Sequence, residues 1–239
     1  FLKPVVGDLG LDRGCFSLVI SLSLFLYGAF MPVVGRLVDR FGSRLVVTIG
    51  ALVLAVSLAA TGRATTLWEL YLFYGIIAAV GFAATGHVVA AAILVRWFVK
   101  RRGTVVGVLS GASMAGMTFL VPISMWFILT VGWRTTYLLL GVFTLVLVLP
   151  LSLWVLRDNP EAIGQHPDGL APDTGRGVSA GLVERTAVSE ALQTPPFWQL
   201  SGGLFTCGFS MSLLSAHGVP MLTDHGFHPM TASWALGLL

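Results

Sequence analysis

The stretch Gly35-Arg36-Leu37-Val38-Asp39-Arg40-Phe41-Gly42-Ser43-Arg44 decides the fold, because it separates two long runs without charge. The runs 14–35 and 45–62 each hold roughly 20 residues, enough to cross ~30 Å of hydrocarbon at ~1.5 Å per residue. Four charges among glycines between two such runs are typical of a short loop that joins membrane spans. The sequence therefore predicts an all-α polytopic membrane protein in which this segment is a tight cytoplasmic turn.

The overall composition agrees with a membrane protein. The mean hydropathy is +0.87, and 10% of the residues are charged, against about a quarter in soluble domains. Residues 1–14 are expected to hold the outer end of one span and a short outer loop. Later spans are predicted at 15–35, 45–62, 68–95, 103–130, 135–156 and 196–222, with a further one from near Pro229.

The basic residues are unevenly distributed between the two sides. Segments 36–44 and 96–102, which fall on one side by alternation, carry three and four Lys or Arg residues. The turns on the other side carry one each, Arg63 and Arg134. The positive-inside rule then makes the richer side cytoplasmic and indicates a multi-pass protein of the cell (inner or plasma) membrane. The net charge of +3 thus reflects membrane topology, and no nucleic-acid partner is expected.

The chain divides into three predicted parts. Residues 1–156 would form an N-terminal six-helix half with its first span mostly missing, 157–195 a polar cytoplasmic linker, and 196–239 the start of a C-terminal half. An offset of 216 residues supports two parallel halves, because it aligns Pro4 with Pro220, Asp8 with Asp224, Gly10 with Gly226, Ser17 with Ser233 and Leu22 with Leu238. We therefore expect a fragment, cut at both ends, of a parent of roughly 430 residues with twelve spans.

The segment 35–44 fits G-x-x-x-D-R-x-G-x-R, which resembles the span 2–3 signature of the major facilitator superfamily. Gly35 would allow close approach of two helices, and Gly42 would permit the tight turn. The resemblance implies that Asp39, Arg40 and Arg44 latch the cytoplasmic side in the outward-facing state. Arg96 is the expected cross-partner of Asp39. The alternative is a basic loop that only sets topology.

Three further stretches resemble the monocarboxylate porter and oxalate/formate antiporter branch: 96–103, 132–134, and 196–198 with 217–227. The resemblance implies transport of a small organic anion, a mono- or dicarboxylate, by alternating access with proton coupling or exchange. A porter for a neutral or cationic solute, a transport-inactive receptor or scaffold, and more remotely a membrane enzyme remain as alternatives.

Four residues are candidates for contact with the substrate. His87 lies nine residues before Arg96, roughly 13 Å into the membrane at ~1.5 Å per residue. A buried ring there is costly unless it faces a cavity or a partner, and histidine is the side chain that exchanges protons near neutral pH. Tyr27, His217 and Ser113 are further candidates, and helix packing is the competing interpretation for all four.

No enzyme signature is present in the sequence, so we predict no catalytic residues, no cofactor and no metal. Cys15 and Cys207 lie in apolar runs and are interpreted as small core residues. The expected partners are the organic anion, protons and the lipid bilayer, and no obligate protein partner is evident.

Overall fold

The structure, a computed structural model, describes residues 2–98, 100–156 and 192–238. Nearly all of these residues are helical, which confirms the predicted all-α class. The predicted linker, 157–195, lies outside the described residues except for its last few positions. In chain order the elements are α1 (Leu2–Leu9), α2 (Arg13–Phe41), α3 (Ser43–Thr61), α4 (Leu67–Leu70), the π-helical η1 (Tyr71–Ile77), α5 (Ala78–Thr85), α6 (His87–Trp97), α7 (Arg102–Phe143), the π-helical η2 (Thr144–Val148) and η3 (Leu151–Val155), α9 (Pro195–Asp224) and α10 (Pro229–Gly237).

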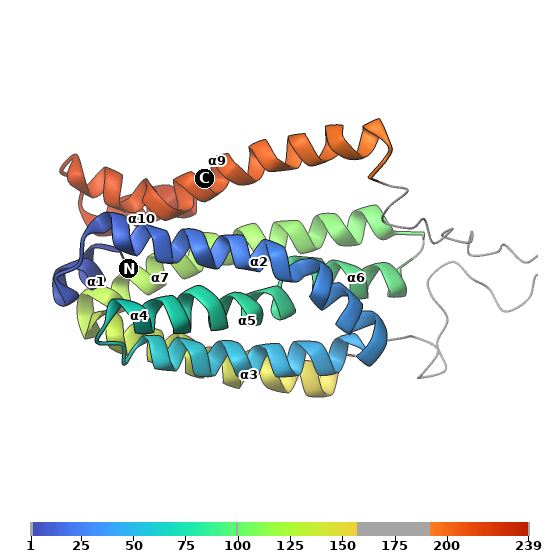
Figure 1. The fold of residues 1–239 in the computed structure, drawn as a ribbon, viewed down its shortest axis with the longest axis horizontal. Helices are drawn as coiled ribbons and strands as arrows, with labels where there is room; N and C mark the ends of the chain where they lie inside the picture. The colour runs from blue at the N-terminus through green and yellow to red at the C-terminus, as the bar shows by residue number, and fades with distance from the viewer. Residues whose placement is uncertain (1, 99, 157–191, 239) are drawn as a thin grey trace, which may run out of the picture.

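Four helical stretches of the described residues are long and apolar enough to cross a membrane: Arg13–Phe41, Ser43–Thr61, Leu67–Trp97 and Arg102–Trp154. The last of them is interrupted at Gly132, whose φ of 83° and ψ of 162° lie outside the helical region. Figure 1 shows the chain reversing there, from green to yellow. This stretch therefore supplies two antiparallel crossings, as the predicted spans 103–130 and 135–156 require.

The chain reversals gather at two ends of an elongated bundle (Figure 1). One end carries residues 35–44, 96–98 and 100–102, and we call it the basic end. The other carries α1, α4, the turn at Gly132 and the connection from α9 to α10, and we call it the opposite end. We call residues 2–156 the N-terminal bundle, and α9 with α10 the C-terminal helices.

Two boundaries differ from the sequence prediction. The charged segment is mostly helical, because α2 continues to Phe41 and only Gly42 interrupts the chain before α3. Gly42 has φ 85° and ψ 155°, a conformation that a side chain makes costly. The predicted span 68–95 is not one continuous helix, because Gly86 is extended, with φ −75° and ψ 174°, and separates α5 from α6.

Small residues bring α3 and α5 close together. A Cβ built on Gly81 would lie 2.7 Å from the Leu54 Cβ, so neither helix could keep its place with a larger residue there. Gly35 was expected to allow the close approach of two helices. No helix comes that close to it in this arrangement, because a Cβ at Gly35 would meet nothing within 4 Å. The close approach falls on α3 and α5 because that is where two helices cross with alanine and glycine between them.

The two copies of the 216-residue repeat adopt the same local structure. In the first, α1 ends at Leu9, Gly10 has φ 61°, and α2 begins at Arg13. In the second, α9 ends at Asp224, Gly226 has φ 88°, and α10 begins at Pro229. Both glycines reverse the chain at the opposite end with a positive φ, which glycine adopts without strain.

Candidate functional site

A cavity of about 1110 Å³ lies between the N-terminal bundle and the C-terminal helices. Its walls come from α1, α2, η1 and α7 on one side and from α9 and α10 on the other. Most of the lining is apolar, and hydroxyls are contributed by serine, threonine and tyrosine side chains: Ser113, Ser124, Ser212, Thr223, Tyr74 and Tyr137. Among the described residues that line it, Lys3 carries the only charged side chain. The cavity can therefore accept a molecule that is mainly apolar and carries one negative charge.

Lys3 forms an ion pair with Asp224. Lys3 belongs to the N-terminal bundle and Asp224 to the C-terminal helices, and we call these two parts the two blocks. Lys3 Nζ lies 2.7 Å from Oδ1 of Asp224, and Arg13 Nη1 lies 2.9 Å from Oδ2 of the same carboxylate. Hydrogen bonds from Lys3 and then from Arg13 lower the pKa of Asp224 below its ordinary value. Asp224 stands beyond the apolar part of α9, with 42% of its side chain exposed. One carboxylate thus joins two cations of the N-terminal bundle at the opposite end.

Two of the candidate residues lie at or near this cavity. Ser113 lines it, and its hydroxyl donates a hydrogen bond of 3.0 Å to the carbonyl of Leu109, one turn back in α7. His217 is exposed on α9, and its Nε2 lies 3.4 Å from Oγ of Ser17 on α2. His217 therefore forms a second polar contact between the two blocks, on the same helix as Asp224.

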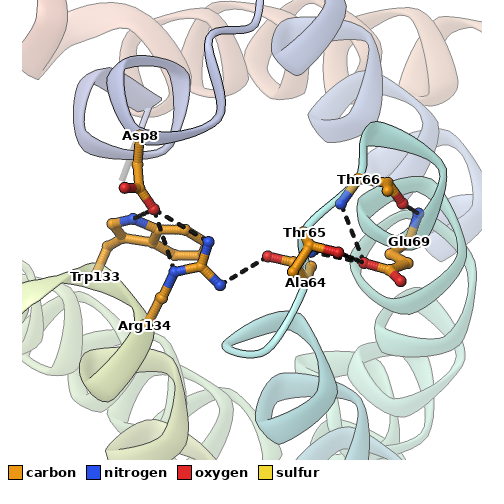
Figure 2. Close-up of polar contacts among 7 residues, drawn as sticks. All are labelled: Asp8, Ala64, Thr65, Thr66, Glu69, Trp133 and Arg134. Atoms are coloured by element: carbon orange, nitrogen blue, oxygen red, sulfur yellow. Dashed lines mark hydrogen bonds and ion pairs between the residues drawn. The ribbon is translucent and has the colours of Figure 1, made fainter.

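A second carboxylate at the opposite end holds the N-terminal bundle together. Oδ2 of Asp8 accepts hydrogen bonds from Nε1 of Trp133 and Nε of Arg134, both at 3.2 Å (Figure 2). Arg134 also donates to the carbonyl of Ala64 at 2.8 Å, and its guanidinium lies 4.5 Å from the centre of the Trp133 ring. This group, which we call the Asp8 clamp, fastens α1 to the turn at Gly132 and to the α3–α4 connection. The clamp thereby fixes the helix that carries Lys3.

The third crossing is the helical stretch Leu67–Trp97, and neighbouring side chains cap its first turn. The Thr66 hydroxyl accepts a hydrogen bond from the N–H of Glu69, and the Glu69 carboxylate accepts from the N–H groups of Thr65 and Thr66 (Figure 2). This capping box satisfies N–H groups that the first turn of a helix leaves without partners. It fixes where the crossing starts beside the Asp8 clamp.

The candidate gating residues gather at the basic end. Nη2 of Arg96, near the end of α6, lies 2.9 Å from Oδ1 of Asp39 in the last turn of α2. The Arg40 guanidinium lies 5.3 Å from the centre of the Phe41 ring. Arg44, at the start of α3, donates a hydrogen bond to the carbonyl of Leu153. These contacts join α6 to α2 and η3 to α3 at this end, and their gating role stays a prediction.

His87 and Tyr27 lie apart from the large cavity. His87 is exposed and is the first residue of α6, directly after the break at Gly86. The Tyr27 hydroxyl faces the same break, because a Cβ built on Gly86 would lie 3.0 Å from its oxygen. The structure thus places both candidates beside the break at Gly86, with His87 on α6 and Tyr27 on α2.

Sequence reasoning missed Lys3, Arg13 and Asp224 as site residues. Lys3 and Arg13 lie outside the apolar runs, so nothing in their spacing distinguishes them from loop charges. One signal was available, because the 216-residue offset aligned Asp224 with Asp8. A carboxylate that recurs at the same place in a repeat is a reasonable candidate for a structural or binding role.

The described residues thus form a bundle of membrane-length helices with a cavity between two parts of the chain. A family model described as Major Facilitator Superfamily matches residues 1–239. The chain belongs to the Major Facilitator Superfamily.

Several curated proteins resemble the chain at modest identity. An uncharacterized MFS-type transporter, YcxA, of Bacillus subtilis (strain 168) is 25% identical over 234 residues, which cover 94% of this chain and 52% of that protein. Monocarboxylate transporter 13 of Bos taurus is 27% identical over 223 residues, or 93% of this chain and 48% of that protein. Monocarboxylate transporter 11 of Homo sapiens is 33% identical over 155 residues, or 62% and 32%. The chain thus spans about half or less of the length of these relatives.

Proposed function

We propose that the full protein is a secondary transporter that moves a small organic anion, a mono- or dicarboxylate, by alternating access. The observation that carries this proposal is the cavity between the two blocks, whose lining is apolar apart from hydroxyls and Lys3. A short monocarboxylate has an apolar end and one negative charge, and each finds its complement there. Relatives named monocarboxylate transporters favour the same substrate class.

The proposal assigns residues 1–156 and 196–239 to two halves that rock about the cavity, joined by the cytoplasmic linker 157–195. Lys3 and Ser113 would contact the substrate in the cavity. His87 and Tyr27 would form a second polar position, nearer the basic end, at the break in the third crossing. Proton symport or anion exchange would supply the energy, since histidine can exchange protons near neutral pH. The carrier would need no cofactor, and the plasma or inner membrane is its proposed location.

Uptake by the full-length protein in proteoliposomes tests the proposal. Radiolabelled pyruvate should accumulate when the outside is acidic or when unlabelled pyruvate is inside, and Lys3→Gln should abolish this uptake. Arg63→Gln is the matched control, because Arg63 is an exposed cation of the opposite end that does not line the cavity. Uptake of a neutral or cationic solute without any transport of pyruvate would establish the alternative porter instead.

The role of His87 has its own test. His87→Ala should cut uptake while the protein inserts into the membrane in normal amounts, because the side chain is exposed and contributes little to packing. Uptake by this variant that matches the wild type at every pH would remove His87 from the mechanism and leave the remaining proposal in place.

A further inference from the structure

Asp224 is the point at which the two blocks are joined by charge. It belongs to the C-terminal helices, whereas both of its partners, Lys3 and Arg13, belong to the N-terminal bundle. The contact between Ser17 and His217 crosses between the same two blocks. Asp224 is the last residue of α9, which turns into α10 at the opposite end (Figure 1).

Close packing also joins the C-terminal helices to the N-terminal bundle and to each other. A Cβ built on Gly237 of α10 would lie 2.9 Å from the carbonyl oxygen of Thr118 on α7, so the two backbones are in close contact. A Cβ on Gly218 would likewise meet the Leu236 side chain, which holds α9 against α10. Asp224 therefore sits on a pair of helices that pack against each other and against the N-terminal bundle.

We propose that Asp224 is the latch that keeps the opposite end of the cavity closed, and that a substrate carboxylate bound at Lys3 releases it. The second clause rests on the proposed function, whereas the first does not. Lys3 is both a partner of Asp224 and a lining residue of the cavity. An anion that enters the cavity must compete with Asp224 for the same ammonium group.

This competition would make release of the latch specific for anionic solutes. A neutral solute has no charge with which to displace Asp224, so it leaves the latch intact. Once Lys3 pairs with the substrate, Asp224 keeps only Arg13, whose side chain is 60% exposed and gains a full hydration shell when it separates. The ligand thus shifts the equilibrium toward the open state through its different affinity for the two states.

The groups that face Asp224 define which variants are informative. Lys3 comes from α1, Arg13 from the start of α2, and His217 lies two turns back on α9 itself. Asp224→Asn removes the charge at constant size, and Asp224→Glu keeps it. Arg13→Gln weakens the latch without touching the cavity. Arg63→Gln removes a cation at the same end that is not part of the latch.

Distance measurements between spin labels test the latch without any substrate. Labels at Trp68 and Met221, which are 79% and 62% exposed, report on the separation of the two blocks in full-length protein whose Cys15 and Cys207 are serine. Asp224→Asn should raise the population with long distances by about two- to tenfold, because it removes two partly exposed ion pairs. Arg13→Gln should give a smaller rise, and Asp224→Glu and Arg63→Gln none. Unchanged distances in both Asp224→Asn and Arg13→Gln would overturn the latch.

Equilibrium binding of pyruvate tests the competition. Asp224→Asn should bind pyruvate two- to tenfold more tightly, about the same factor by which it opens the latch, because Lys3 is free. A merely structural role would weaken binding, so weaker or unchanged binding overturns the competition. In the wild type, pyruvate should lengthen the label distances and its neutral amide should not. If pyruvate binds no variant, including the wild type, the proposed substrate and its competition at Lys3 both fall, while the substrate-free distances still decide the latch.

Discussion

Replacement of Asp8 by alanine tests the Asp8 clamp, which fixes the helix that carries Lys3. The variant removes the acceptor of two groups, the indole N–H of Trp133 and the guanidinium of Arg134. The two losses differ in size because their surroundings differ. Trp133 is 5% exposed, so water cannot easily replace Asp8 at its N–H. Arg134 is partly exposed and keeps the carbonyl of Ala64.

The expected cost follows from these environments. A buried N–H without an acceptor costs about 1–3 kcal/mol, and a partly exposed ion pair contributes about 0.2–1 kcal/mol. We therefore expect Asp8→Ala to lower the free energy of unfolding by roughly 1–4 kcal/mol, most of it from Trp133. Asp8→Asn should cost only about 0.2–1 kcal/mol, because the amide oxygen can still accept from the indole.

Reversible unfolding of the full-length protein in mixed micelles of increasing SDS content measures these differences. Trp133→Phe removes the donor and keeps the ring, so the pair Asp8→Ala and Trp133→Phe forms a double-mutant cycle. The two changes should be coupled by about 1 kcal/mol, since either one alone removes the same hydrogen bond. Equal losses for Asp8→Ala and Asp8→Asn, with no coupling to Trp133→Phe, would refute the reasoning.

Three further predictions concern the two ends. Gly42→Ala should lower the free energy of unfolding by about 1–3 kcal/mol because of its backbone conformation, whereas the helical Gly35→Ala should be neutral or stabilising in the same SDS titration. Asp39→Asn should raise cysteine labelling of the basic end about 1.4- to 5-fold, because its single ion pair with α6 is partly exposed; unchanged labelling would deny the pair a part in gating. The lowered pKa of Asp224 means that its charge is kept above the ordinary aspartate value of about 3.9 and lost only as the pH falls through the depressed value. Label distances in a His217→Gln background should therefore agree at pH 7.5 and 5, and a difference would assign the pH response to another group.

The crossings could be predicted from the sequence because membrane spans follow from length and charge alone. The limits of α3 and of the crossings on either side of Gly132 agree with the uncharged runs within a few residues. The charged segment 35–44 was harder, because charges do not by themselves end a helix. α2 continues through them until Gly42 adopts a backbone conformation that favours glycine.

The site could be predicted only in part, for a physical reason. Ser113 was a candidate and does line the cavity, but which residues of α7 face the cavity depends on how α7 rotates against its neighbours, which a single helical sequence does not fix. The break at Gly86 was missed because glycine within an apolar run also occurs in continuous spans. Contacts between distant residues, such as Lys3 with Asp224, depend on packing of the whole chain and leave no local pattern.

The repeat has an aspartate at the same position in both copies, Asp8 and Asp224. We assign different roles to the two residues, and the surroundings of each fit its role. A contact that must persist should be costly to break, and Asp8 bonds to an indole N–H that is almost fully buried. A contact that must open in each transport cycle should lose little when its partners part. Asp224 meets only cations that water can rehydrate, Lys3 and Arg13, and one of them also borders the cavity. In the proposed transport cycle, the clamp would belong to the body that moves and the latch to the boundary along which it moves.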